Sequence, residues 1–193
     1  MSRHIALGLL LAMAFGLPTP AGTQTPEAAW AALKQPGTVA IMRHARAPGT
    51  GDPATFELGD CSTQRTLSAA GRVQARRIGQ AFRARGVDID RVLTSQWCRC
   101  RDTAELLDLA PVEAFPALNS FFEDRSTRDQ QTAAVRDFLA DAPDSEKLVL
   151  VTHQVNITAL TDVFPSSGEV VVIEVGDDGA VDVRGTVLIG ARP

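Results

Sequence analysis

Two histidines and two arginines of this 193-residue chain stand at or just beyond the ends of apolar runs. Arg43 and His44 follow "TVAIM", His153 follows "KLVLVT", and Arg99 comes shortly after "RVLTS". Guanidinium groups bind phosphate oxygens in a bidentate way. An imidazole nitrogen can attack phosphorus while neighbouring cations hold the phosphoryl oxygens. If these side chains meet, their chemistry is phosphoryl transfer.

The apolar runs before these residues have the pattern of strands in one open α/β sheet. Val39–Met42, Val92–Thr94 and Leu148–Thr152 are short and almost wholly apolar, as expected of strands buried on both faces. Such sheets bind their ligands at the carboxyl ends of parallel strands. The helix that starts close to Arg99 would add backbone donors at its N-terminus. We expect one cleft to gather Arg43, His44, Arg99 and His153, with Arg46 nearby.

Helices and strands alternate along most of the chain. Pro26–Gly37, Ser68–Gly86, about Arg99–Leu109 and Gln130–Leu139 are predicted helices, whereas Ala45–Gln64 has no period and is predicted as a long loop. Pro111–Phe115 is a further candidate strand, and the last 22 residues up to Gly190 indicate two or three strands joined at Asp177-Asp178-Gly179. We therefore predict a three-layer α/β/α fold with a mostly parallel central sheet that is antiparallel toward its C-terminal edge.

The composition is that of one globular domain and argues against nucleic-acid binding. Hydrophobic residues make up 45% of the chain, which supplies a sizeable core. The formal net charge is -4 and the sequence pI is about 5.4, whereas nucleic-acid binders usually carry a basic surface.

The N-terminus has the layout of a cleavable secretory signal. Arg3 precedes the apolar run Ile5–Leu17, and prolines and small residues follow it. The run is shorter than the about 20 apolar residues of a membrane span. We predict a signal peptide over residues 1–22, a domain over residues 23–193, a periplasmic or secreted location, and no stable membrane insertion after cleavage.

Three cysteines would then reach an oxidising space, enough for one disulfide and one free thiol. Cys61 with Cys98 or with Cys100 is the expected bridge. The Cys-x-Cys spacing has no second cysteine pair or nearby histidine pair, so a structural zinc site is not predicted.

Four motifs, in order, resemble those of the histidine phosphatase superfamily, branch 1, the phosphoglycerate mutase-like phosphatases. "MRHA" is similar to the family's Arg-His-Gly signature, with Ala45 in place of glycine, and "TLSAAGRVQA" to its Leu-Ser/Thr-x-x-Gly-x-x-Gln-Ala helix start. "TSQWCRCRDTA" is similar to its Ser-x-x-x-Arg-x-x-x-Thr-Ala pattern, and "LVTHQVNI" to its second-histidine strand. The four motifs span about Thr38 to Ile157.

The resemblance implies that His44 is the nucleophile, which becomes phosphohistidine. Arg43, Arg99 and His153 would bind the phosphoryl group, and Arg46 is a further candidate. The family needs no metal ion and no cofactor. It commonly takes a proton donor from a loop after the third strand, where Glu123 is the first candidate and Asp124 the second, with no donor as the third possibility. Gln154 stands where the larger acid phosphatase branch has aspartate, so that arrangement is not supported.

These predictions describe a phosphomonoester hydrolase that acts on a small phosphorylated substrate of the envelope or periplasm, such as a sugar or heptose phosphate. A phosphohistidine protein phosphatase and a mutase would share the same residues. A non-catalytic binder of anionic sugars is the alternative from another functional class.

Overall fold

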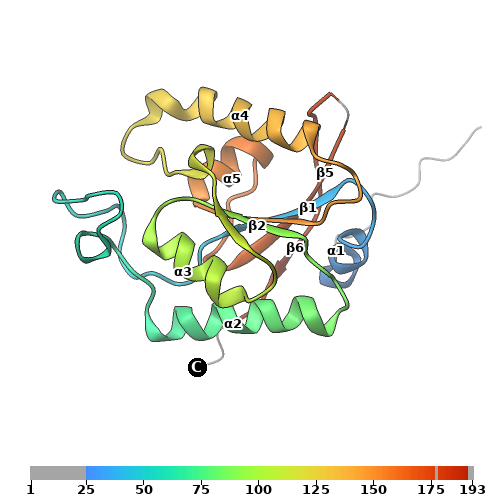
Figure 1. Ribbon diagram of the computed structural model, residues 1–193, viewed down its shortest axis with the longest axis horizontal. Helices are drawn as coiled ribbons and strands as arrows, with labels where there is room; N and C mark the ends of the chain where they lie inside the picture. Colours follow the sequence, from blue (N-terminus) through green and yellow to red (C-terminus); the bar gives the residue numbers. More distant parts are fainter. Residues whose placement is uncertain (1–24, 177, 191–193) are drawn as a thin grey trace, which may run out of the picture.

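The computed structural model describes residues 25–176 and 178–190 (Figure 1). The predicted signal peptide lies outside the described residues. In the described part of the chain, no helix is long and apolar enough to cross a membrane.

A six-stranded sheet forms the centre of the fold. Its order is β3-β2-β4-β1-β5-β6. The first four of these strands pair in parallel, and β5 and β6 join them as antiparallel neighbours. This confirms the predicted sheet with its antiparallel C-terminal edge. The strands are β1 (Thr38–Arg43), β2 (Arg91–Thr94), β3 (Val112–Ala114), β4 (Leu148–Thr152), β5 (Glu169–Val175) and β6 (Val181–Leu188).

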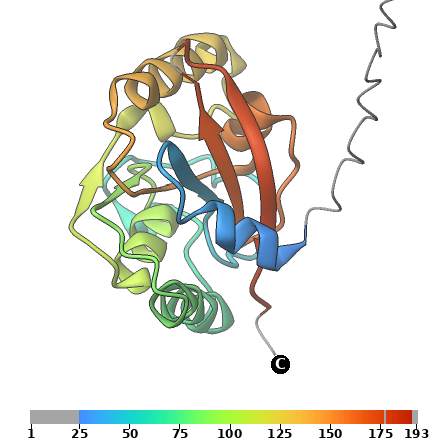
Figure 2. The same cartoon turned by 90° about the vertical axis from the view of Figure 1, so that its right-hand side faces the viewer.

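Helices cover both faces of this sheet (Figure 1). On one face lie α2 and α3, with α1 against β6 (Figure 2), and on the other lie α4 and α5. Each face has its own apolar core. Ile78 and Phe82 belong to the first core, and Leu139 and Ile157 to the second. The helices are α1 (Pro26–Ala32), α2 (Ala69–Ala84), α3 (Cys98–Leu107), α4 (Arg128–Asp141) and α5 (Gln154–Thr161), with short 3-10 turns η1 (Cys61–Thr63), η2 (Pro116–Leu118) and η3 (Arg125–Thr127).

The central strands are apolar because both of their faces are covered. All five residues of β4 are buried, as are the first five of β1. Parallel strands between helical layers have this continuous pattern. The hydrophobicity of β1 and β4 therefore allowed both strands to be predicted from the sequence.

One helix was not predicted. α5 begins directly after His153, which occupies its N-cap position without a side-chain capping bond. The segment has no Ser, Thr, Asp or Asn capping residue and no proline at its start, so the usual sequence signal for a helix start is missing. Burial of Ile157 and Leu160 against the sheet stabilises it instead.

Two glycines of α2 set how closely this helix approaches its neighbours. A Cβ at Gly71 would overlap the carbonyl oxygen of Arg46, and one at Gly79 would overlap the carbonyl oxygen of Leu107. Ser68 accepts a bond from the Gly71 amide and caps the helix as predicted. The start of α2 therefore packs directly on the backbone that follows β1.

Candidate active site

The two histidines meet because β1 and β4 are parallel neighbours. Arg43 is in register with Thr152, and the His44 amide donates to the Thr152 carbonyl at 2.9 Å. Each histidine directly follows its strand, so both lie at the same edge of the sheet. The ring centroids of His44 and His153 lie 5.5 Å apart, and the residues are 2% and 4% exposed.

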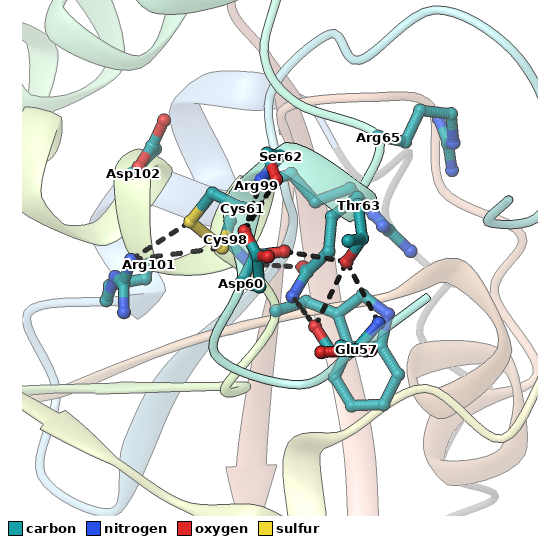
Figure 3. Close-up of a disulfide and its surroundings, with 12 residues drawn as sticks. Glu57, Asp60, Cys61, Ser62, Thr63, Arg65, Cys98, Arg99, Arg101 and Asp102 are labelled. Atoms are coloured by element: carbon teal, nitrogen blue, oxygen red, sulfur yellow. Dashed lines mark hydrogen bonds between the residues drawn. A yellow bond between two sulfur atoms is a disulfide. The ribbon is translucent and has the colours of Figure 1, made fainter. Parts of the chain in front are cut away.

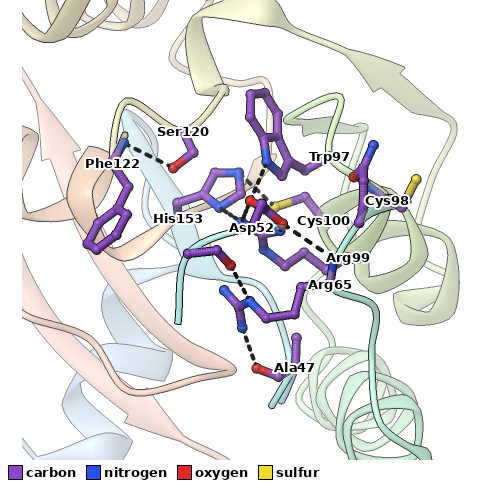
Figure 4. Close-up of polar contacts among 12 residues, drawn as sticks. Ala47, Asp52, Arg65, Trp97, Cys98, Arg99, Cys100, Ser120, Phe122 and His153 are labelled. Atoms are coloured by element: carbon purple, nitrogen blue, oxygen red, sulfur yellow. Dashed lines mark hydrogen bonds and ion pairs between the residues drawn. The ribbon is translucent and has the colours of Figure 1, made fainter. Parts of the chain in front are cut away.

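Arg99 reaches both rings from the first turn of α3. Its Nε donates to His44 Nε2 at 3.2 Å. Its Nη2 lies 3.4 Å from His153 Nδ1, and Figure 4 shows these two side chains together. Arg43 lies beside this group at the end of β1. These four residues line one cavity of about 560 Å³. The structure therefore brings together the residues that the strand ends predicted.

The hydrogen bonds of His44 fix which ring nitrogen is available. Nδ1 lies 2.8 Å from the carbonyl oxygen of Ala45, which can only accept, so Nδ1 carries the proton. Nε2 then holds a lone pair and faces Arg99. Burial, followed by the charges of Arg99, Arg43 and Arg65, lowers the pKa of His44 to about 3, against the backbone bond to Ala45, which raises it. The ring is neutral at neutral pH and suited to nucleophilic attack.

His153 is likewise a neutral, buried imidazole. Its Nε2 lies 2.9 Å from the Ser95 hydroxyl and 3.4 Å from the Cys100 sulfur. Burial, then His44 and Arg99, lowers the pKa of His153 well below its ordinary value. Nδ1 remains on the side of Arg99, where it can contact a phosphoryl oxygen.

Arg43 has a donor without a partner. Its Nη1 donates to the Pro165 carbonyl at 3.1 Å, which fixes the guanidinium in place. Its Nε is buried and has no hydrogen-bond partner among the described residues. Burial and the charge of Arg99 lower the pKa of Arg43 from its usual value. An unpaired buried donor is costly, so this cation is well prepared to bind an anion.

Sequence reasoning missed two charged residues of this cavity, Asp52 and Arg65, both of which line it. The Asp52 carboxylate accepts from Arg99 Nη1 at 2.6 Å and from Nη2 at 3.0 Å, and from the Trp97 indole at 3.0 Å. Arg65 donates through Nε to Gly51 at 2.7 Å and through Nη1 to Ala47 (Figure 4).

Asp52 and Arg65 escaped notice because both stand in the predicted long loop or at its end. That loop has no periodicity from which a side-chain direction could be derived. The only available signal was the position of Arg65 three residues before the Ser68 cap, which ties it to the start of α2.

The remaining predicted residues, Arg46, Glu123 and Asp124, are all exposed. Arg46 is exposed and is not one of the cavity-lining residues; its amide donates to Gln74 and its carbonyl accepts from the Ser68 amide. Glu123 and Asp124 do line the cavity, at its exposed rim. The Asp124 carboxylate accepts from the Ser126 hydroxyl and amide, and this bonding lowers its pKa.

Aromatic side chains form the mouth of the cavity. The Phe56 ring is stacked on Trp97 with centroids 4.9 Å apart. Phe122 and Phe164 also line the cavity, and they are 41% and 73% exposed. The site is thus cationic at its base and aromatic at its entrance, with the Glu123 and Asp124 carboxylates at the rim.

The disulfide joins Cys61 to Cys98 (Figure 3). Cys100 is a free, buried thiol. This decides between the two partners that the sequence left open. Burial is the main cause that raises the pKa of Cys100 to about 12, so it stays protonated. The bridge anchors the loop of Asp52 and Arg65 to the residue before Arg99. Within residues 25–176 and 178–190, no group of three or more His, Cys, Asp or Glu residues could hold a metal ion.

Comparisons with known proteins found a matching family model and solved structures of the same fold. A model of the histidine phosphatase superfamily (branch 1) matches residues 39–122. The fold is similar to the protein histidine phosphatase SixA complexed with tungstate, at 18% identity and a TM-score of 0.56, covering 77% of this chain and 95% of that one.

Two further solved structures show the same fold. A putative phosphohistidine phosphatase SixA from Nakamurella multipartitia has 24% identity and a TM-score of 0.54, with 78% of this chain and 95% of that chain covered. A mycobacterial glucosyl-3-phosphoglycerate phosphatase complexed with VO3 has 16% identity and a TM-score of 0.54, with 76% and 95% covered. No curated protein matches the sequence.

Proposed function

We propose that this chain hydrolyses phosphomonoesters through a phosphohistidine. The match to the model of the histidine phosphatase superfamily (branch 1) and the phosphatases among the similar structures support a phosphatase enzyme. One observation carries the proposal. The unprotonated Nε2 of His44 faces the donors of Arg99 at the base of the cavity. The nucleophile and an anion-binding group therefore lie next to each other at the base of the cavity.

The first half-reaction transfers the phosphoryl group to His44. Arg43, Arg99 and His153 hold the phosphoryl oxygens, and Arg65 adds positive charge from the loop. Nε2 of His44 bonds to phosphorus as the bond from phosphorus to the leaving oxygen breaks. Because the Nδ1 proton of His44 is held by Ala45, the phosphorylated ring carries one positive charge, which the phosphoryl oxygens offset.

The second half-reaction returns the enzyme to its starting state. A water oxygen bonds to phosphorus, the bond to Nε2 breaks, and inorganic phosphate leaves. The leaving oxygen of the first step and the attacking water of the second both need a proton carrier. Glu123 and Asp124 stay candidates from their order in the sequence, and both lie at the rim.

A small sugar phosphate is the substrate that we favour, including a phosphorylated heptose of the cell envelope. The aromatic mouth offers flat apolar faces to the ring of a sugar, and the rim carboxylates of Glu123 and Asp124 can accept from its hydroxyl groups. A neighbour that acts on a glucosyl phosphoglycerate agrees with this choice. The SixA neighbours favour a phosphohistidine protein as the second candidate.

We also propose a periplasmic or secreted location. The basic, apolar and small-residue layout of residues 1–22 supports it. The Cys61–Cys98 disulfide supports it as well, because such bridges persist in oxidising compartments.

The test is a screen of phosphate release from sugar phosphates, nucleotides and phosphohistidine peptides, with His44→Ala as the paired variant. The wild type should release phosphate and form an acid-labile phosphohistidine, and the variant should do neither while still binding inorganic phosphate. Transfer between two positions of one substrate, without net release, would indicate a mutase. Absence of both hydrolysis and phosphohistidine in the wild type would refute the enzyme and leave the anionic-sugar binder.

A further inference from the structure

Asp52 occupies the phosphate-binding side of Arg99. The two Nη atoms of Arg99 donate to the two carboxylate oxygens of Asp52 at 2.6 and 3.0 Å (Figure 4). Nε of the same guanidinium donates to His44 Nε2 at 3.2 Å. One planar group thus joins the carboxylate to the nucleophile. A bidentate carboxylate uses the donors that a phosphoryl group would use.

This pair is enclosed rather than solvated. The side chain of Arg99 is 3% exposed and that of Asp52 is 10% exposed. Trp97 donates to Asp52 from one side, and the Arg65 amide donates at 3.3 Å from another. Interactions between charges are strong in such a place, and so is the penalty for a charge that loses its partner.

A bound substrate would reverse the environment of Asp52. A phosphoryl dianion that takes the donors of Arg99 removes the partner of the carboxylate and puts negative charge beside it. Both changes favour the protonated acid. Substrate binding would thereby raise the pKa of Asp52, so that the carboxylate takes up a proton from solvent.

We propose that Asp52, rather than Glu123 or Asp124, is the proton donor of the reaction, an inference that rests on the proposed phosphatase function. As the bond from His44 Nε2 to phosphorus forms and the bond to the ester oxygen breaks, Asp52 gives its proton to that oxygen and the alcohol leaves. The resulting carboxylate then takes a proton from the attacking water, whose oxygen bonds to phosphorus as the bond to Nε2 breaks.

The alternatives are less well placed. Glu123 and Asp124 are exposed at the rim, and the Asp124 carboxylate is bonded to Ser126. The backbone turns just before Asp52 at Gly49 and Gly51, whose φ values of +93° and +66° glycine adopts without strain.

The titration of Asp52 in the complex depends on every charge around it. In the free enzyme, burial raises its pKa but the hydrogen bonds and charge of Arg99 outweigh this, so the pKa lies below its usual value. The other charged and titratable groups around this cavity are Arg43, His44, Arg65, Glu123, Asp124 and His153.

The experiment compares leaving groups in Asp52→Asn, Glu123→Gln and the control Glu57→Gln. Glu57 is an exposed carboxylate of the same loop and is not one of the cavity-lining residues. The leaving group of glucose 6-phosphate is an alkoxide, which needs a proton. The leaving group of p-nitrophenyl phosphate is p-nitrophenolate, which leaves without one. We expect Asp52→Asn to lower kcat for glucose 6-phosphate by about 10²–10³-fold and to change p-nitrophenyl phosphate hydrolysis little.

The other variants and the pH profile complete the test. Glu57→Gln should keep wild-type kinetics with both substrates. Glu123→Gln should show the same ratio of kcat between the two substrates as the wild type, whatever it does to KM for the sugar phosphate. The fall of kcat toward high pH that marks a general acid should be present in the wild type and absent in Asp52→Asn. Asp52→Glu should recover part of the lost rate, and thermal unfolding of each variant checks that it is folded.

Three results would overturn the assignment. An equal loss with both substrates would mean that Asp52 only positions Arg99. A gain with both substrates, together with tighter binding of inorganic phosphate, would mean that Asp52 only blocks the site. Leaving-group dependence in Glu123→Gln would assign the proton to the rim. In each case wild-type phosphohistidine formation would still uphold the proposed function, which fails separately if no phosphohistidine forms.

Discussion

The Cys61–Cys98 disulfide should be a large contributor to stability. It spans 37 positions of the chain, from the long loop to the first residue of α3. In the chain-entropy model, a closed loop of this length removes entropy from the unfolded state worth about 3.8 kcal/mol at 25 °C. For a domain of this size that energy corresponds to a Tm lower by about 8–15 °C when the bridge is lost.

The change to make is the double substitution Cys61→Ser with Cys98→Ser, measured by urea and thermal unfolding. Cys100→Ala is the matched control, because it removes a cysteine two residues away and leaves the bridge intact. We expect the control to cost about 1 kcal/mol. Addition of reductant should destabilise the wild type and the control and leave the double variant unchanged.

The same bridge should also affect catalysis. It anchors the loop that holds Asp52 and Arg65 to the residue before Arg99, so its loss should raise KM as well as lower Tm. A double variant that unfolds within about 1 kcal/mol of the wild type would contradict the entropic argument. Three accessible thiols in the oxidised wild-type protein under denaturing conditions would contradict the bridge. A free thiol located at Cys98 instead of Cys100 by alkylation and peptide mapping would contradict the pairing.

Three further predictions follow from buried groups. In the folded protein the pKa of His44 is lowered to about 3 and that of His153 lies well below its ordinary value. Below about pH 6.5 the unfolded chain therefore binds more protons at these residues, and the free energy of unfolding should fall as the pH drops, by up to about 1.4 kcal/mol per pH unit for each histidine. Urea unfolding across this range should show a shallower decline when both are replaced by Asn, and an unchanged decline would contradict the assignment. Arg99→Lys keeps the charge but cannot make the contacts to the carboxylate and the nucleophile together, so kcat/KM should fall by at least about 10²-fold; a loss below tenfold would show that charge alone suffices. Gly79→Ala should lower the free energy of unfolding by about 1–3 kcal/mol, because its Cβ would overlap the backbone at the end of α3, whereas Gly190→Ala, which meets nothing within 4 Å, serves as the neutral comparison.

The residues at the base of the cavity could be predicted because the central strands can occupy only one kind of place in a fold, the inside of a covered sheet. β1 and β4 are apolar on both faces, so they had to lie inside a covered sheet, and their polar successors had to leave at one edge. Arg43, His44 and His153 follow from that arrangement, and Arg99 follows from the helix that starts after the neighbouring strand β2. No knowledge of the loops was needed.

The loop from Ala45 to Gln64 could not be predicted in the same way. Asp52 is placed by Arg99 and Trp97, which are distant in sequence. Arg46 is carried outward because its backbone is held against the start of α2. The local sequence pattern carries no information on such contacts. The sequence therefore predicted a site that included Arg46, which does not line the cavity, and left out Asp52, which does.

The choice of cysteine depended on helix geometry. Cys98 and Cys100 are two positions apart in α3, which turns them about 200° from each other. Cys98 faces the loop, while Cys100 points into the core toward the Thr152 carbonyl. Once the start of the helix is known the choice follows, but the sequence alone left that boundary open.

The loop after β1 is held at both of its ends. Substrate entry, to which the loop contributes, is therefore separate from placement of the histidines, which the sheet determines. The contact of Gly71 with Arg46 holds its beginning, and the Cys61–Cys98 bridge holds its end. Between them the chain forms part of the mouth without forming part of the sheet. Residues 53–60 can therefore be exchanged or lengthened to accept a different leaving group while Asp52 keeps its contacts and the histidines stay where the strands place them. This makes the segment after Asp52 the one to vary in a library selected for new substrates.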